Sequence, residues 1–175
     1  MQAPPLSVGG KFKIDIAQSL GFRVLLGTAI GASIGQATNT PGEWGQGADA
    51  YGERFASSLG GYLSRQTFAF VLETALHEDP RYFPSTERTK KARLWNVVKQ
   101  TVIAKTDTGR STFAYAGVIS AFGAGQLVNT WQPKSNSGVS DGIERGFITL
   151  GLDAASHLFQ EFVPRLRPRE LRQKP

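Results

Sequence analysis

The chain has two histidines, and each has a carboxylate four residues away. Residues four apart share one face of a helix, and imidazole and carboxylate groups on facing helices can together bind a divalent metal. The candidate metal ligands are Glu73, His77, Asp153, His157 and Glu161. Their spacing differs from the Glu-x-x-His pattern of the di-iron bundles. The alternative is that they form surface ion pairs, with His77 stabilised near the negative C-terminal end of its helix.

The densest polar stretch is HEDPRYF, at residues 77–83. As an acid–base site it would use Glu78 or Asp79 as the base and Arg81 to position an anion. We favour a helix terminator instead, because the residue before a proline is pushed out of the helical region. In that interpretation Arg81 bonds to nearby carboxylates or carbonyls, and Tyr82 anchors the connection. The absence of cysteine excludes disulfides and thiolate metal sites.

Small residues recur at every fourth position in several segments, so each series would form a helix stripe without side chains. A helical glycine costs up to about 1 kcal/mol relative to alanine. Close approach of a second helix would offset this cost through dispersion and Cα–H···O contacts. The candidate packing positions are Gly27, Gly31, Gly35, Gly52, Gly60, Gly117 and Gly125. Such spacing is best known from membrane helices, and tight packing within one soluble bundle is the alternative.

Apolar periodicity predicts that helices position these residues, over 14–37, 49–76, 90–104, 111–131 and 141–163. Strands compete at 113–119 and 147–152, but alternation is poor there and we predict helix. Asp141 and Glu144 resemble a capping box for the last helix. The predicted fold is all-α, a single bundle of about four to five helices with tightly packed Gly/Ala/Ser-rich faces. It comprises residues 14–163, between an extended arm (1–13) and a basic mobile tail (164–175).

The net charge of +6 favours an anionic partner, either nucleic acid or an acidic membrane surface. The basic run at 88–93 with Trp95 could contact phosphate and stack a base, but nucleic acid is the least supported partner. No charge lies between Arg23 and Glu43 or between Arg110 and Lys134, and these gaps reach the roughly 20 residues of a membrane span. A conventional span would hold more Leu, Ile and Val, so crossing a membrane and lying on its surface both stay open.

Two groups of residues carry a resemblance to a known family. They are QATN at 36–39 with GQG at 45–47 and YG at 51–52, and HEDPRYF at 77–83. Through them the chain, from about Pro5 to Pro164, resembles an uncharacterised family of bacterial predicted exported or envelope proteins. The resemblance implies a location and transfers no catalytic residue. The sequence QAPP at 2–5 also reads as a mature N-terminus left by signal cleavage. We therefore expect the periplasm or outer membrane, with the cytoplasm as the alternative.

These observations favour a non-enzymatic helical envelope protein that associates with a membrane surface or forms a homo-oligomer through its small-residue faces. The alternative is a metal-binding protein or enzyme that uses Glu73 and His77 with Asp153, His157 and Glu161. The sequence specifies neither a cofactor nor a small-molecule ligand.

Overall fold

The computed structural model describes residues 6–19 and 21–163 and is mostly helical, with one small sheet. The helices are α1 (Val8–Ser19), α2 (Phe22–Ala37), α3 (Ala48–Ala75), α4 (Lys90–Val102), α5 (Tyr115–Val128) and α6 (Val139–Phe162). Two short 3₁₀ turns, η1 (Gly42–Trp44) and η2 (Lys134–Asn136), lie in the long loops. The strands are β1 (Glu78–Asp79), β2 (Ile103–Thr106) and β3 (Ser111–Phe113).

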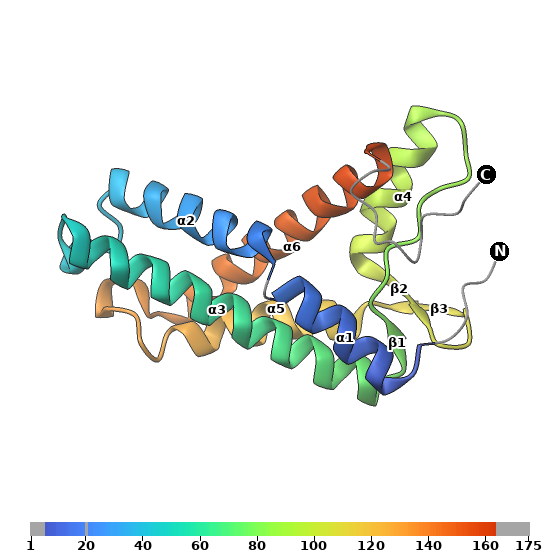
Figure 1. Cartoon of the computed structure of the whole chain (residues 1–175), viewed down its shortest axis with the longest axis horizontal. Coiled ribbons are helices and arrows are strands. Elements are labelled where there is room, and N and C mark those ends of the chain that lie inside the picture. Colours follow the sequence, from blue (N-terminus) through green and yellow to red (C-terminus); the bar gives the residue numbers. More distant parts are fainter. Residues whose placement is uncertain (1–5, 20, 164–175) are drawn as a thin grey trace.

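The longest helix, α3, is the spine of the molecule. Helices α1 and α2 follow one another along it, and α5 packs beside it in the opposite direction (Figure 1). Helix α6 packs on α5 and then runs on to meet α4 (Figure 1). The chain therefore has a helical layer around α3 and α5, from which α2 and the α4–α6 pair diverge.

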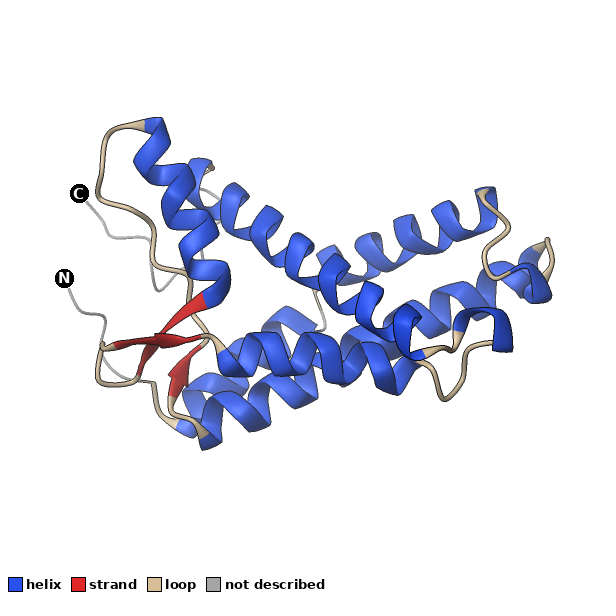
Figure 2. Cartoon of the chain, turned by 180° about the vertical axis from the view of Figure 1, so that it is seen from behind, coloured by secondary structure: helices blue, strands red, loops and turns tan. Residues whose placement is uncertain are grey.

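The three strands form an antiparallel sheet in the order β1-β2-β3 at one end of α3 (Figure 2). Strand β2 pairs with β3 through a tight hairpin turn, where Gly109 has a φ of 80°, a conformation that favours glycine. Strand β1 adds to the other edge of β2, with Glu78 opposite Thr106. The sheet thus ties the end of α3 to the connection between α4 and α5.

Several predicted boundaries need correction. The helix predicted over 14–37 is two helices, and residues 8–13 belong to α1 instead of an extended arm. The Ser7 hydroxyl explains the early start, because it accepts a hydrogen bond from the Gly10 amide (3.1 Å) and caps the helix. Residues 103–104 and 111–113 form strands, because the turn between them pairs them as a hairpin.

Helix α6 begins two residues before the predicted start. Asp141 lies in the first turn of α6, and its carboxylate accepts a hydrogen bond from the Gly138 amide (2.7 Å). Asp141 therefore reaches back to the cap position instead of occupying it. The predicted basic tail, residues 164–175, and residues 1–5 of the arm lie outside the described part of the chain.

The buried apolar residues are mostly small, with Tyr82 as the exception. They are Ala32, Ala50, Ala69, Tyr82, Val97, Ala114, Ala116, Ala121, Ala124 and Val128. Among side chains that the structure describes, no Leu, Ile, Phe or Trp is fully buried, although these are the residue types that usually fill a core. The described helices include none with the length and apolar character needed to cross a membrane. Many large apolar side chains of the described residues are instead exposed on the surface.

Candidate functional site

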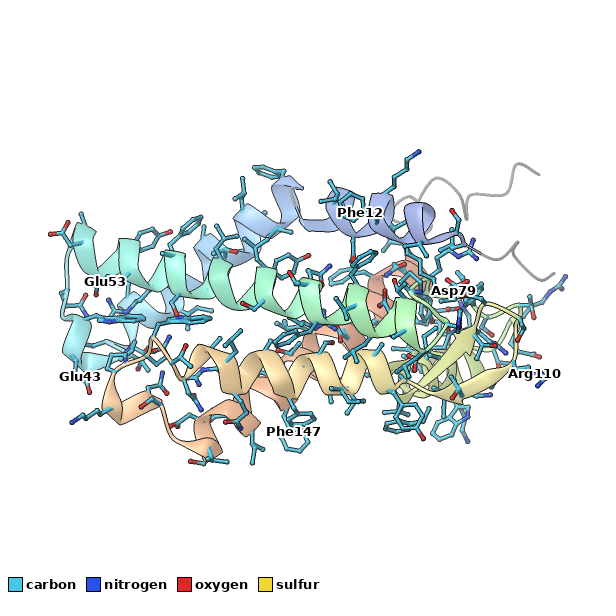
Figure 3. All side chains as sticks on the ribbon, turned by 90° about the horizontal axis from the view of Figure 1, so that it is seen from below. Phe12, Glu43, Glu53, Asp79, Arg110 and Phe147 are labelled. Carbon is cyan, nitrogen blue, oxygen red and sulfur yellow. The ribbon has the colours of Figure 1, made fainter. Side chains whose placement is uncertain are left out.

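A cavity of about 190 Å³ lies where α3, α6 and the sheet meet, and we call it the polar cavity. Residues of α1, α3, α4, α5, α6, β1 and β2 line it, including Asp15, Arg65, Glu73, Asp153 and His157. Figure 3 shows this end of the molecule at Asp79, far from Glu43 and Glu53 at the opposite end. Segments distant in sequence thus contribute ionisable side chains to one partly open cavity.

The five candidate metal ligands divide between three places. Glu73, Asp153 and His157 line the polar cavity, whereas His77 is exposed and Glu161 is fully buried elsewhere. Helix α3 ends at Ala75 and His77 has a φ of 55°, so Glu73 and His77 do not share a helix face as predicted. His77 Nδ1 lies 3.5 Å from a carboxylate oxygen of Asp107. Within residues 6–19 and 21–163, no three His, Asp or Glu side chains converge to hold a metal ion.

The polar stretch after α3 is tied into the fold through its charged groups. Arg81 forms a bidentate pair with Asp79, through Nε (2.9 Å) and Nη2 (2.6 Å). The carboxylate of Glu78 accepts hydrogen bonds from the amides of Tyr115 (3.1 Å) and Ala116 (3.2 Å) at the start of α5. Glu78 therefore caps α5, and Arg81 bonds to a nearby carboxylate as the terminator interpretation expects.

Lys11 of α1 links α1 to the end of α3 that lies next to the sheet. Its buried ammonium donates to the backbone carbonyls of Glu73 (2.9 Å) and Glu78 (2.7 Å) and to the Asp107 carboxylate (3.0 Å). This role was not predicted from the sequence, because Lys11 lies in the segment expected to be an extended arm. A single lysine after two glycines in GGKF has no spacing to other charged residues that would indicate this role.

In the polar cavity, Arg65 pairs with Asp153 at 2.6 Å, but Asp15 and Glu73 have no ion-pair partner among the described residues. Burial raises the pKa of Asp15 to about 6, against the opposing charge of Arg65. Burial and the negative charge of Asp15 raise the pKa of Glu73 to about 8. At neutral pH, Asp15 is therefore mostly ionised and Glu73 mostly protonated.

His157 is neutral at physiological pH, because burial and the nearby Arg65 charge lower its pKa to about 4. Its ring stacks on Tyr82 with centroids 4.6 Å apart, and its Nδ1 lies 3.4 Å from the Thr101 hydroxyl. A neutral imidazole can accept or donate a hydrogen bond, so the cavity offers an acceptor without charge beside the two carboxyl groups.

Glu161 is 0% exposed and has a complete set of partners. Its Oε2 accepts from the Tyr82 hydroxyl (2.6 Å) and the Ser85 amide (3.0 Å), and its Oε1 accepts from Arg93 Nε (2.8 Å). Burial acts to raise the pKa of Glu161, but the bonds from Arg93, Tyr82 and Ser85 outweigh it and the pKa is lowered. Glu161 therefore links α6 to α4. Arg93 of the basic run forms an ion pair within the protein.

The glycines of α5 and α6 meet at close range. Gly125, Gly142 and Gly146 are buried. A Cβ atom at Gly125 would collide with the carbonyl oxygen of Gly142, and one at Gly146 would collide with the Phe122 ring. Gly125 thus lies at a close helix contact. Of the other candidate packing positions, a Cβ at Gly60 would lie 3.7 Å from the Trp131 ring, and a Cβ at Gly117 would touch only Ala114, at 4.0 Å.

The glycines of α2 are mostly open. A Cβ at Gly27 would meet no described atom within 4 Å, and one at Gly31 would meet only the Ser58 hydroxyl, at 3.9 Å. A Cβ at Gly35 would lie 3.1 Å from the Arg54 side chain of α3 and 3.0 Å from the Thr40 carbonyl oxygen of the following loop. Gly52 of α3 also has open space around it.

Large apolar side chains surround the open glycines of α2. Helix α2 packs mainly on α3, and the exposed side chains are Phe22, Leu25, Leu26, Ile30 and Ile34. Phe22 is 77% exposed and Ile34 is 60% exposed. We call this surface, with Gly27 and Gly31, the α2 face. A second exposed apolar surface lies on α6, where Phe147 points away from the ribbon (Figure 3).

The segment GASIG at 31–35 matches the Gly-x-Ser-x-Gly pattern of hydrolase nucleophiles. It lies inside α2, and the Ser33 hydroxyl donates to the Ala29 carbonyl (2.8 Å) in the preceding helical turn. A nucleophile elbow requires a strand-to-helix turn, so the match carries no catalytic role here.

The chain matches no protein-family model, no curated protein and no solved structure. The resemblance to bacterial envelope proteins therefore stays a prediction.

Proposed function

We propose that the chain is a self-associating helical protein in which the α2 face packs against the α2 face of a second copy. The observation that carries the proposal is that α2, with no charged residue after Arg23, has apolar residues around its circumference and packs mainly on α3. A helix that is apolar all round is normally buried on most sides. Contiguous exposed apolar surface of this kind is typical of an interaction site.

The open glycines favour a protein helix as the occupant over lipid chains. Gly27 and Gly31 each destabilise α2 by up to about 1 kcal/mol relative to alanine, and no close helix contact within the described chain offsets this cost. A second helix that approaches the stripe closely would gain dispersion and Cα–H···O contacts. The α5–α6 contact demonstrates this use of glycine in the same protein.

A two-fold dimer is the simplest assembly that fits this face, because a self-complementary patch pairs with its own copy. Helix α2 has 16 residues and is about 24 Å long, enough for several turns of contact. A location in the bacterial envelope belongs to the same proposal and depends on the resemblance described above. A membrane surface is the competing occupant of the α2 face.

The test compares sedimentation of the wild type with Ile34→Glu, which places a charge on the α2 face. Val98→Glu on α4, at a side chain 55% exposed, is the matched control. We expect a wild-type dimer, about 10-fold or greater weakening of its association by I34E, and little change with V98E. A wild type that stays monomeric and floats with phosphatidylglycerol vesicles, in a manner that I34E abolishes, would replace the dimer by a membrane surface.

A further inference from the structure

Helix α4 packs on the protein through polar side chains and exposes most of its apolar ones. It stands at the sheet end of the molecule, next to α6 (Figure 1). The Arg93 guanidinium donates to the Glu161 carboxylate (2.8 Å). The Asn96 amide donates to the Phe83 carbonyl (3.0 Å), and Val97 is the one buried apolar residue of the helix. The exposed apolar side chains are Leu94, Trp95, Val98 and Val102. Surface helices of soluble domains normally bury their apolar face, so the outer side of α4 suits an apolar environment outside the chain.

The exposed apolar residues of α4 form one row with lysines on both sides. Leu94, Val98 and Val102 are four residues apart and share a helix face. At 3.6 residues per turn, Lys90 and Lys99 lie on opposite sides of this row. Both lysines are exposed, and neither has an ion-pair partner among the described residues. We define the α4 face as Lys90, Lys91, Leu94, Trp95, Val98, Lys99 and Val102.

The surroundings of the α4 face are basic. Glu87 is the only acidic residue in the segment 84–106, which also contains the exposed Arg88. An open groove of about 410 Å³ lies beside the helix, and within the described chain its lining is Lys99, Lys105 and uncharged residues. The α4 face therefore combines an apolar centre with positive margins, and a fitting partner must place negative groups next to an apolar layer.

We propose that the α4 face docks on a membrane surface of acidic phospholipid, with the helix lying in the plane of the interface. The apolar row faces the acyl-chain boundary, and the ammonium groups of Lys90 and Lys99 reach the lipid phosphates on either side. Trp95 lies at the level of the headgroups, where tryptophan is enriched. Helix α4 has 13 residues and is about 20 Å long, so it lies on the bilayer and does not cross it. This contact is separate from the α2 face and goes beyond the proposed dimer.

Two other occupants fit the α4 face less well. A second copy would place its own lysines against those of the first, and like charges repel. A nucleic acid would pair its phosphates with the lysines but would leave Leu94, Val98 and Val102 without an apolar partner. The α2 face differs from the α4 face, because α2 has no charged residue after Arg23 with which to attract phosphates.

Flotation with vesicles of phosphatidylglycerol or of phosphatidylcholine tests the docking. We expect the wild type to bind phosphatidylglycerol vesicles about 10-fold more tightly or better, and added salt to weaken this binding by screening. Val98→Glu should weaken it about 10-fold or more, because a carboxylate then lies in the apolar row. Val71→Glu on α3 is the matched control, since Val71 and Val98 are both 55% exposed. It should bind like the wild type.

The lysines are tested separately from the apolar row. Lys90→Gln combined with Lys99→Gln should weaken binding to phosphatidylglycerol vesicles about 10-fold or more, since two attractions to anionic lipid are lost. Lys13→Gln combined with Lys134→Gln is the control, because it removes the same net charge at exposed lysines of other elements. A role for overall charge alone predicts equal losses, and such a result would contradict docking through α4.

Tryptophan fluorescence identifies the part of the chain that meets the lipid. Trp95 is 67% exposed, so its emission should move to shorter wavelength when vesicles of phosphatidylglycerol cover it. Trp95→Phe keeps an apolar ring on the α4 face and retains Trp44 and Trp131. This variant should still bind the vesicles, and its emission should not shift. A shift of wild-type size in W95F would place the lipid contact elsewhere.

Lipid docking and dimerisation can fail independently. V98E should form the wild-type dimer while it loses vesicle binding, and circular dichroism confirms that it is folded; if V98E unfolds, the lysine variants and W95F decide. Absence of vesicle binding by the wild type, equal binding to both lipids, or an equal loss in V71E would overturn the proposal. Vesicle binding that V98E keeps and I34E loses would assign the lipid to the α2 face. Tighter binding of single-stranded DNA than of phosphatidylglycerol vesicles would replace the membrane by a nucleic acid.

Discussion

The α5–α6 contact and the α2 face carry the same spacing of small residues and have opposite surroundings. In the first, a Cβ at Gly125 would collide with the backbone of Gly142. In the second, a Cβ at Gly27 would meet open space. At the first contact the loop over 129–138 returns α6 onto α5, and Arg145 donates a hydrogen bond to Asn129 Oδ1 there (2.5 Å). Small-residue spacing therefore marks a face suited to close approach without saying which helix approaches it.

The largest expected effect is on the stability provided by the α5–α6 contact. Gly125→Leu should lower the free energy of unfolding by on the order of 4 kcal/mol, because the side chain has no room against the α6 backbone. Gly27→Leu should leave the monomer as stable or more stable by up to about 1 kcal/mol, from better helix propensity. Urea unfolding of both variants under dissociating conditions measures the contrast. Equal destabilisation by the two variants would contradict the difference between the α5–α6 contact and the α2 face.

The next effect concerns the carboxylates, which show the same contrast. The Glu161 carboxylate accepts hydrogen bonds from Tyr82 and Arg93. The Glu73 carboxyl has no hydrogen-bond or ion-pair partner among the described residues. Glu161→Gln should lower the free energy of unfolding by about 2 to 3 kcal/mol, because Arg93 then loses its charge partner. Chemical unfolding at pH 7 measures this, with the exposed Glu144→Gln of the same helix as the control. A loss below that of E144Q would contradict the tethering role of Glu161.

A smaller effect is expected on association. Gly27→Leu should weaken the dimer about 10-fold, roughly 1.4 kcal/mol, because its side chain holds the two α2 helices apart. Gly151→Leu on α6, at another glycine with open space around it, is the matched control. Sedimentation across a concentration series gives both dissociation constants. Unchanged association of G27L would place the interface elsewhere.

The smallest effect is on pH dependence. Because the folded-state pKa of Glu73 is raised from 4.5 to about 8, its carboxyl makes the wild type less stable as pH rises through that interval. Glu73→Gln removes this dependence. At pH 9 we expect it to be more stable by on the order of 1 kcal/mol, since water in the cavity screens the charge. Melting temperatures from pH 4 to pH 9 measure the difference, which should vanish at the acid end.

The sequence predicted the long helices and the end of α3, because apolar periodicity and the proline after Asp79 are local signals. It did not predict the hairpin of β2 and β3, whose formation depends on pairing between residues separated by a turn. Half of the polar cavity was also predictable. Glu73, Asp153 and His157 were selected by spacing, but Asp15 was not, because its role depends on α1 packing along α3.

The central claim is that α2 meets α2 of a second copy, and distance measurement between spin labels tests it most directly. The chain has no cysteine, so Ser33→Cys on exposed α2 and Thr86→Cys in an exposed loop each give one label site. Two packed helices of about 24 Å, with axes about 8 to 10 Å apart, place the S33C labels of a dimer within about 30 Å of each other. The T86C labels should be farther apart. A dimer with no coupling between S33C labels would contradict the account.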